Sequence, residues 1–529
     1  MDKAKITPAP ADDYLTKAFA AGHPDGCACK VVSTAQGYFY LLLALGWLFL
    51  LKYRWDLFIF SAAAILGFLY SAAVLFRGSA SILAIFGCGE DKVKKPELDA
   101  MKPEELPVYT VLVPLYREAN IVGKLLAGIA RLDYPKDKLD VKLLLEANDA
   151  ETLDALKAHG IPDYCEIIIA PDSLPRTKPR VCNYGLAAAR GEFCVIFDAE
   201  DAPEPDQLKK ALAVFRRDQA GRVACVQAKL NYFNSRTNLL TRLFTVEYSV
   251  NFELMLPGLQ LFRLPLPLGG TSNHFRTELL RQIGPWDPYN VTEDCDLGIR
   301  IYEAGYRTRL VDSTTWEEAN SEPGNWLRQR SRWVKGFAQT HLVHYRNPLR
   351  TIRKLGLWGA FGGYLAVGGS VLMMLTNVIF WLILLLYGAL LIHGVSHGAS
   401  ISELVIGPES GPRTYQGIVL GKLVLRAWPL VYVGATESPV WSLLSQVFFF
   451  SGIVLFFSNF FFIGVGVLAC CKRKFYHLIP AALLMPFYWV MISLGAWKGF
   501  IQLFTNPFYW EKTRHGLVTK DVPAKAVEI

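Results

Sequence analysis

Two acidic clusters hold the side chains best suited to chemistry, and the first is Asp198-Ala199-Glu200-Asp201. It follows directly after the apolar run Phe193–Phe197. Carboxylates that gather at the end of a buried strand repel one another unless a cation joins them, so a divalent metal that bridges a diphosphate would suit Asp198 and Glu200. The cluster could also cap a helix that begins near Pro205, with Asp201 as the cap. The two roles are compatible.

The second acidic cluster is Thr292-Glu293-Asp294, with Asp296 close behind it. The same pattern is typical of a helix start, where a carboxylate only stabilises the helix dipole. A basic stretch, Gln329-Arg330-Ser331-Arg332-Trp333, lies just before an apolar region and could bind lipid headgroups. However, these residues could also bind a sugar diphosphate. They supply an amide, a guanidinium that matches phosphate and an aromatic ring on which a sugar can stack.

Strands that alternate with helices must position these clusters. A helix is expected over Ile121–Ile129, and the alternation predicts an α/β domain with a mostly parallel sheet over residues 103–350. Ligands bind at the carboxyl ends of such strands, where Glu118, Glu146 and Asp149 stand. Neither a GxGxxG fingerprint nor a Walker loop is present, which argues against a dinucleotide enzyme or a P-loop NTPase. The expected strands are Tyr109–Pro114, Val141–Leu145, Glu166–Ala170 and Phe193–Phe197.

The composition indicates a membrane protein. Of 529 residues, 52% are hydrophobic and only 19% are charged, and the net charge is +8, which suits contact with anionic lipids or an anionic substrate. This excludes a small soluble domain, a disordered chain and the basic patch of a nucleic-acid binder. The ten cysteines form no disulfide framework in a chain of this length and are expected to be reduced.

Six transmembrane helices are expected, in pairs over residues 31–77, 351–392 and 440–504. Thr376 and Asn377 would divide the second pair. Residues 1–30 and 505–529 would be cytosolic like the middle domain, and residues 393–439 would form a cytosolic loop with an interfacial helix near Ile418–Trp428. This arrangement leaves Lys472, Arg473 and Lys474 in a short external loop, against the positive-inside rule.

The motifs occur in an order that resembles the membrane-embedded, processive family 2 glycosyltransferases, which include cellulose, curdlan, chitin and hyaluronan synthases. The resemblance covers most of the chain, from Val31 to Thr519. It implies a cytosolic GT-A domain inserted into a polytopic helical membrane domain. The matching features are Pro114-x-Tyr116-x-Glu118, Glu146, Thr177-Lys178, the Asp198 cluster, Gly269-Gly270-Thr271-Ser272-Asn273, Thr292-Glu293-Asp294 and the Q-x-x-R-W of Gln329, Arg332 and Trp333.

The resemblance also implies a role for each matching residue. Asp294 would be the general base, supported by Glu293, and Trp333 would lie under the acceptor sugar. Asp198 and Glu200 would hold Mg²⁺ or Mn²⁺ on a UDP-sugar. The remaining donor contacts would come from Tyr116, Glu118, Glu146, Asp149, Lys178, Gln329 and Arg332, and a lid over the nucleotide would come from Trp510, Thr513 and Arg514.

Two departures from the family pattern leave contacts open. Asp-Ala-Glu replaces Asp-x-Asp, so either Glu200 or Asp201 would reach the metal, and Glu146-Ala147-Asn148-Asp149 replaces the acidic pair on the uridine side. The tail contains one extra residue in its W-x-T-R segment and could instead be an interfacial aromatic belt.

The resemblance implies an inverting, processive β-glycan synthase of the bacterial plasma membrane. It would transfer sugar, with glucose preferred, from a UDP-sugar to a growing polysaccharide and move that polymer across the membrane. Its partners would include membrane lipids but no nucleic acid, with export partners left open. The alternatives are a non-processive enzyme that adds one sugar to a lipid-linked acceptor and a channel or transporter with a degenerate cytosolic domain.

Overall fold

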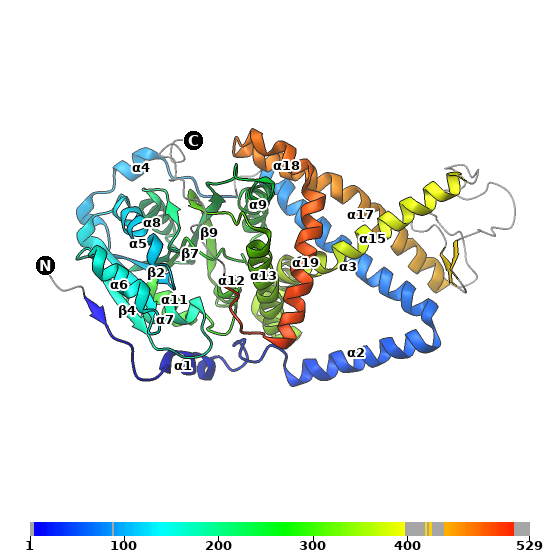
Figure 1. Ribbon diagram of the computed structural model, residues 1–529, viewed down its shortest axis with the longest axis horizontal. Coiled ribbons are helices and arrows are strands. Elements are labelled where there is room, and N and C mark those ends of the chain that lie inside the picture. Colours follow the sequence, from blue (N-terminus) through cyan, green and yellow to red (C-terminus); the bar gives the residue numbers. More distant parts are fainter. Residues whose placement is uncertain (1–4, 87–88, 397–417, 421–422, 426–438, 513–529) are drawn as a thin grey trace.

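Strands buried on both faces build the middle of the chain. In β2 (Tyr109–Leu115), Val111 and Val113 point into one apolar core and Leu112 points into another. Such a strand is typical of a sheet that helices cover on both sides. The computed structural model describes residues 5–86, 89–396, 418–420, 423–425 and 439–512, and this sheet forms its central domain (Figure 1).

Within the described residues the sheet has nine strands in the order β1-β4-β3-β2-β5-β8-β7-β9-β6. Neighbours from β1 to β5 are parallel, β8 is antiparallel to both β5 and β7, and β9 is parallel to β7. Five of the eight neighbouring pairs are parallel, so the sheet is mostly parallel, as expected, with an antiparallel part around β8 and β6. The other strands are β1 (Ile6–Thr7), β3 (Leu139–Glu146), β4 (Cys165–Ala170), β5 (Phe193–Ile196), β6 (Ala202–Pro203), β7 (Val223–Tyr232), β8 (Asn273–Arg276) and β9 (Arg307–Glu317).

All four expected strands are present, as β2 to β5, but β7 to β9 escaped the sequence patterns. β7 alternates apolar residues with Gln227, Lys229 and Asn231, which are all buried. Their burial depends on partners far away in the chain. The amide of Gln227, for example, accepts a hydrogen bond from the backbone N–H of Gly269 at 2.8 Å.

Helices cover both faces of the sheet. α5 (Val122–Ala130), α6 (Ala150–His159) and α8 (Gln207–Arg217) pack on one face, and α7 (Lys178–Ala187), α11 (Thr277–Ile283) and α12 (Glu293–Glu303) pack on the other. The N-terminal segment joins this domain, because β1 extends the sheet beside β4 and α1 packs on α7. Further helices are α1 (Tyr14–Gly22), α4 (Lys95–Asp99), α9 (Leu239–Val250), α10 (Leu256–Leu261), α13 (Pro323–His344) and α14 (Pro348–Gly363).

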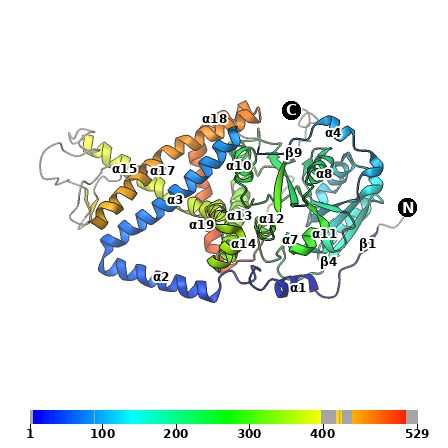
Figure 2. The same ribbon diagram turned by 180° about the vertical axis from the view of Figure 1, so that it is seen from behind.

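Long apolar helices form an arm that projects from the central domain (Figures 1 and 2). They are α2 (Thr34–Tyr53), α3 (Trp55–Phe86), α15 (Gly369–Ser396) and α17 (Pro439–Lys472). After α18 (Ile479–Leu483), α19 (Met485–Thr505) runs across the base of the arm beside α13. In the part of the chain that the structure describes, three helices are long and apolar enough to cross a membrane, or four if the bent pair Tyr476–Leu483 and Met485–Thr505 counts as one span.

The arrangement of the arm differs from the expected one at three points. α15 continues through Thr376 and Asn377 without a break, because Thr376 Oγ1 donates to the Leu372 carbonyl at 2.7 Å and stays within the helix. Over 351–392 the chain runs from α14 through a π-helical turn, Tyr364–Gly368, into α15, and its kink lies at Gly356 instead of at Thr376 and Asn377. In the loop 393–439, the described residues Ile418–Leu420 and Leu423–Leu425 pair as an antiparallel ribbon, where a helix was expected. Two short aliphatic runs around a glycine are typical of a hairpin.

The third difference concerns Lys472 and Arg473, which do not lie in an external loop. α17 returns to the central domain, where the carboxylate of Glu253 is 3.2 Å from Lys472 Nζ and 2.7 Å from Arg473 Nε. Arg473 also donates to Thr314 Oγ1 at 3.1 Å. The basic residues thus stand on the side of the central domain, as the positive-inside rule requires if that domain is cytosolic.

The position of this basic stretch predicts the outcome of cysteine labelling in oriented membrane vesicles. We expect an impermeant maleimide to label Lys474→Cys from the same face as Lys102→Cys in the central domain. Tyr53→Cys, at the far end of α2, should be labelled only from the opposite face. The unsubstituted chain measures the background from native cysteines. Labelling of positions 474 and 53 from one face would contradict this arrangement.

Candidate active site

Asp198 stands where β5 ends and the chain leaves the sheet. Asp201 holds this turn, because its Oδ2 accepts hydrogen bonds from the Asp198 backbone N–H (2.8 Å) and from Thr271 Oγ1 (2.5 Å). Asp198 and Glu200 line a cavity, and Asp201 is not among the residues that line it. The structure therefore favours Glu200 over Asp201 as the partner of Asp198.

Lys178, at the start of α7, lies between the two acidic clusters. Its ammonium group forms an ion pair with Asp198 and donates to the Gly270 carbonyl at 2.7 Å. Burial alone would lower the pKa of Lys178, but the carboxylates of Asp198 and Glu293 raise it above its usual value. Lys178 is therefore a fixed cation at this end of the cavity.

The second acidic cluster begins α12 and is held close to α13. Thr292 occupies the N-cap position, yet its side chain makes no capping hydrogen bond, so the capping-box interpretation does not hold. A Cβ atom at Gly336 of α13 would overlap the Thr292 side chain, so only glycine permits this approach. Glu293 and Asp294 line the same cavity as Asp198.

Glu293 and Asp294 are two neighbouring carboxylates away from bulk water. Burial, followed by repulsion from Asp294, raises the pKa of Glu293 to about 8. Burial raises the pKa of Asp294 to about 6, against the Cys295 backbone N–H and the cations Lys178 and Arg332. Burial therefore disfavours two negative charges on this pair, and the carboxylate that stays ionised can accept a proton.

α13 presents the Q-x-x-R-W residues to the cavity, which Gln329, Arg332 and Trp333 all line. The side-chain Oε1 of Gln329 accepts a hydrogen bond from the Asn320 side-chain amide at 2.8 Å. The Trp333 ring lies 6.1 Å from that of Tyr248, with the Arg330 guanidinium 4.8 Å from its centre. These contacts fix the indole plane on the wall of the cavity.

The expected donor contacts at the ends of β2 and β3 separate into two groups. Tyr116 and Glu118 follow β2, on either side of Arg117, which adopts a positive φ of 56°. Asp149 caps α6 by accepting from the Thr152 backbone N–H at 3.2 Å, and it also accepts from the Arg117 backbone N–H at 2.5 Å. It therefore braces the Tyr116–Glu118 loop.

Glu146, at the end of β3, is buried beside Arg180. It is 6% exposed, and its Oε2 lies 3.3 Å from Nη2 of the fully buried Arg180. Burial raises the pKa of Glu146, and Arg180 opposes that rise. Tyr116, Glu118, Glu146 and Asp149 all lie outside the residues that line the cavity.

The C-terminal strap, residues 506–512, runs from α19 across α13 toward the loop after β2. The Trp510 ring lies 4.2 Å from the Arg332 guanidinium. Lys512 donates to the Tyr116 carbonyl, and Glu511 accepts from Ser331 Oγ at 2.7 Å. Trp510, one of the residues of the expected lid, thus lies against Arg332, and Thr513 and Arg514 lie outside the described residues.

One cavity of about 400 Å³ connects these groups with the arm. Its wall includes Asp198 and Asp294 at the central domain, Trp333 on α13, and Tyr70 and Asn377 on α3 and α15. Reactive carboxylates, an aromatic platform and the interior of the helical arm therefore share a continuous space.

A divalent cation would find oxygen ligands at the first acidic cluster. Asp198 and Glu200 face the cavity beside Glu317, and Asp201 Oδ1 is buried without a hydrogen-bond partner. Among the described side chains, no three of His, Cys, Asp or Glu form a complete metal site. Mg²⁺ commonly takes one or two carboxylates from the protein and its other oxygens from substrate phosphates and water. Asp198 and Glu200 fit such a shared site.

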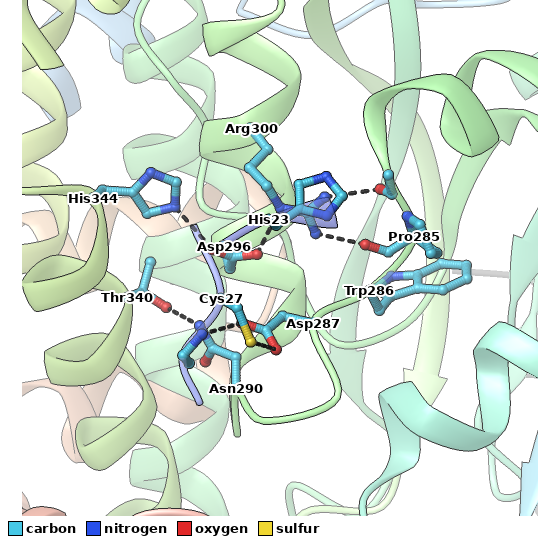
Figure 3. A network of polar contacts seen from close by, with 12 residues as sticks. His23, Cys27, Pro285, Trp286, Asp287, Asn290, Asp296, Arg300, Thr340 and His344 are labelled. Atoms are coloured by element: carbon cyan, nitrogen blue, oxygen red, sulfur yellow. Dashed lines mark hydrogen bonds and ion pairs between the residues drawn. The ribbon is translucent and has the colours of Figure 1, made fainter. Parts of the chain in front are cut away.

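A network of polar contacts with the N-terminal segment and α13 holds the turn before α12 in place (Figure 3). Asp287, which is fully buried, accepts a hydrogen bond from the Ala28 backbone N–H at 2.5 Å. Asn290 donates to Thr340 Oγ1 on α13 at 2.9 Å. The N-terminal segment and α13 therefore both fix the turn that carries Asp294.

Residues 107–336 match the family described as "Glycosyltransferase like family 2". The match extends from the start of β2 into α13 and includes both acidic clusters and the Q-x-x-R-W motif. Residues 107–336 therefore resemble a family 2 glycosyltransferase domain. The sheet with helices on both faces is the α/β architecture that the sequence predicted.

The chain is also similar to curated proteins. "Probable glycosyltransferase YdaM" from Bacillus subtilis is 28% identical over 238 residues, which cover 44% of this chain and 56% of that protein. "Probable glucomannan 4-beta-mannosyltransferase 7" from rice (Oryza sativa subsp. japonica) is 26% identical over 247 residues, 44% of this chain and 41% of that protein. The similarity thus spans about half the length of these relatives.

Among solved structures, the mannosyltransferase PcManGT from Pyrobaculum calidifontis, in complex with GDP-Man and Mn²⁺, matches 61% of this chain and 94% of its own. The sequence identity is 21% and the TM-score is 0.39.

Several residues of the candidate site were not predicted from the sequence. Glu317, at the end of β9, joins the first acidic cluster, and Gly336 leaves room for Thr292. Gln339 of α13 accepts a hydrogen bond from the Val291 backbone N–H (3.3 Å) and donates one to the Pro507 carbonyl (3.0 Å), so it links the turn before α12 to the strap. For Gly336 and Gln339, the only signal in the sequence was their position a few residues after Q-x-x-R-W.

His344 predicts how the stability of this site depends on pH. Its ring is 2.8 Å from Asp296 and 2.9 Å from Glu303, and although burial lowers the pKa of His344, these bonds raise it to about 9. A folded pKa above the unfolded value of about 6.5 gives stability that is full below pH 6.5 and lost as the pH rises through 9.

We therefore expect His344→Gln to lower the free energy of unfolding by about 3 kcal/mol at pH 6, as for a broken buried ion pair, and by little above pH 9. Thermal unfolding between pH 6 and pH 10 measures the difference. His159→Gln, at the exposed end of α6, is the control. A deficit that stays constant across this range would refute the charged state of His344.

Proposed function

We propose that this protein is an inverting, processive β-glycan synthase that uses a nucleotide-sugar donor. The observation that carries the proposal is the single cavity that joins Asp198 and Asp294 to the interior of the arm past Trp333. A polymer that is extended at the carboxylates and leaves through the membrane needs such a path. The arm would cross the plasma membrane, and the glycosyltransferase domain with both described ends would lie in the cytosol.

The donor would lie between the loop after β2 and α13. Tyr116 and Glu118 would contact the nucleoside, and Lys178, Gln329 and Arg332 would bind the diphosphate. Asp198 and Glu200 would hold Mg²⁺ or Mn²⁺, which would neutralise the charge that develops on the leaving nucleotide. Glu146 and Asp149 would act indirectly, through Arg180 and through the loop that carries Tyr116.

Asp294 would remove the proton from the acceptor hydroxyl as that oxygen attacks the anomeric carbon. A sugar hydroxyl is a poor nucleophile at neutral pH, and a positioned base contributes about 10²–10⁴ in rate. Glu293 would keep the negative charge on Asp294, and Trp333 would stack on the acceptor sugar. Attack opposite the nucleotide converts an α-linked donor into a β-linked product.

The sugar itself requires a direct test. The family resemblance favours UDP-glucose, whereas the rice relative is named as a mannosyltransferase, which brings in GDP-mannose. The full-length protein in detergent would be incubated with Mg²⁺ or Mn²⁺ and each labelled donor, and the products would be sized by gel filtration. We expect one donor to yield material of high mass.

Asp294→Asn is the matched control for this assay, because it keeps the shape and removes the base. We expect it to lower transfer at least about 10²-fold while donor binding persists. Full activity of this variant would place the base elsewhere. Product that stops at one added sugar on a lipid would instead support the non-processive alternative.

The strap predicts a second effect on the donor. Trp510→Ala removes the ring that lies over Arg332, so we expect donor affinity to fall about tenfold, as for the loss of a desolvated cation–π contact. Tyr509→Ala, whose side chain is 57% exposed on the same strap, should have little effect. Equilibrium binding of the nucleotide sugar measures both. Unchanged affinity and turnover in Trp510→Ala would rule out a lid.

A further inference from the structure

One cation lies in the part of the cavity that the arm forms. Among the described residues, α3, α15 and α17 contribute a single charged side chain to the cavity wall, that of Arg77. Their other contributions are uncharged and include Tyr70, Met373 and Phe462. Arg77 lies within the candidate span Ala64–Phe86, where a charge is costly unless it has a partner.

Arg77 is held in place by a neutral partner. Its Nη1 donates to Ser370 Oγ at 2.8 Å, and Ser370 in turn donates to the Ala366 carbonyl at 2.6 Å. No carboxylate of the described residues forms an ion pair with the guanidinium within 4 Å. The hydroxyl therefore orients the charge of Arg77, and the carboxylate that attracts the guanidinium, Glu247, does so without direct contact.

The carboxylate that α9 contributes to the same cavity is already satisfied. Glu247 Oε1 and Oε2 accept hydrogen bonds from Arg330 at 2.8 and 2.6 Å, and Tyr488 Oη donates to Oε2 at 2.7 Å. Arg330 neutralises Glu247. The group formed by Glu247, Arg330 and Arg77 therefore keeps one positive charge.

We propose that Arg77 binds an anionic group carried by the acceptor. A guanidinium fork matches a carboxylate or a phosphate with two parallel hydrogen bonds, and the low-dielectric surroundings of the apolar arm make this pairing stronger. The identity of the ligand as the acceptor rests on the proposed function, because the same cavity reaches Asp294. The anion itself is inferred from the unbalanced charge alone.

Two sources could supply this anion. An acidic sugar in the growing chain would present a carboxylate, and a lipid-linked sugar would present a phosphate. Octyl glucuronide and octyl glucoside form a matched pair of probes, because the glucuronide carries a carboxylate where the glucoside carries a hydroxymethyl group. Decyl phosphate tests the phosphate.

The experiment is calorimetric titration of the full-length protein with each probe below its micelle concentration, without nucleotide sugar. We expect the wild type to bind octyl glucuronide or decyl phosphate at least about tenfold more tightly than octyl glucoside. Arg77→Gln should abolish this preference, and Arg77→Lys should retain part of it. Arg353→Gln, on the exposed face of α14, is the matched control and should retain all of it.

Tighter binding of the glucuronide would identify an acidic glycan, and tighter binding of the phosphate a lipid-linked acceptor. Equal binding of charged and neutral probes, or a preference that survives in Arg77→Gln, would overturn the proposal. If Arg77→Gln does not fold, Ser370→Ala, which leaves the charge but removes its orienting bond, should weaken the preference severalfold. Because no transfer is measured, failure here is distinct from failure of the glycosyltransferase assay.

Discussion

The close packing of α13 against the turn before α12 is the contact on which the site depends. Gly336 lets Thr292 approach, and Gln339, Thr340 and His344 then bond Val291, Asn290 and Asp296. One turn earlier on the same helix, Arg332 and Trp333 face the cavity. The distance between the general-base candidate and the aromatic platform is thus set within one rigid helix and its immediate contacts, and a side chain at position 336 would change it.

The cavity is also organised by charge. Its domain end gathers Asp198, Glu200, Glu293, Asp294 and Glu317 around Lys178 and Arg332. Burial and mutual repulsion raise the pKa values of Glu293 and Asp294, so this end favours cations and a proton-accepting carboxylate. Among the described residues of α3, α15 and α17, Arg77 is the one charged side chain on the cavity wall. A ligand that reaches from one end to the other therefore meets opposite electrostatic surroundings, which suits a reacting hydroxyl at one end and an anion at the other.

Buried ion pairs attach the arm to the central domain. Glu253 lies within 3.3 Å of Lys229 from the sheet and within 3.2 Å of Lys472 and 2.7 Å of Arg473 from α17. Removing one member would leave an uncompensated buried charge, which costs more than the pair contributes. This attachment brings α17 back to the domain and lets α19 cross the base of the arm, where its C-terminal end leads into the strap.

The sequence by itself determined the parallel half of the sheet, the two acidic clusters and the Q-x-x-R-W helix. Apolar periodicity and polar residues at strand ends are local properties of the sequence. The order of the motifs can likewise be read along the chain without knowing the fold. Only the tertiary structure decided that Glu146 and Asp149 support the site, that Asp201 holds a turn and that α15 is unbroken. The polar residues of β7, the return of α17 beside Glu253 and the place of Glu317 depend on partners that are distant in the chain. A buried polar side chain is stable only with its partner, and the sequence does not show which partner that is.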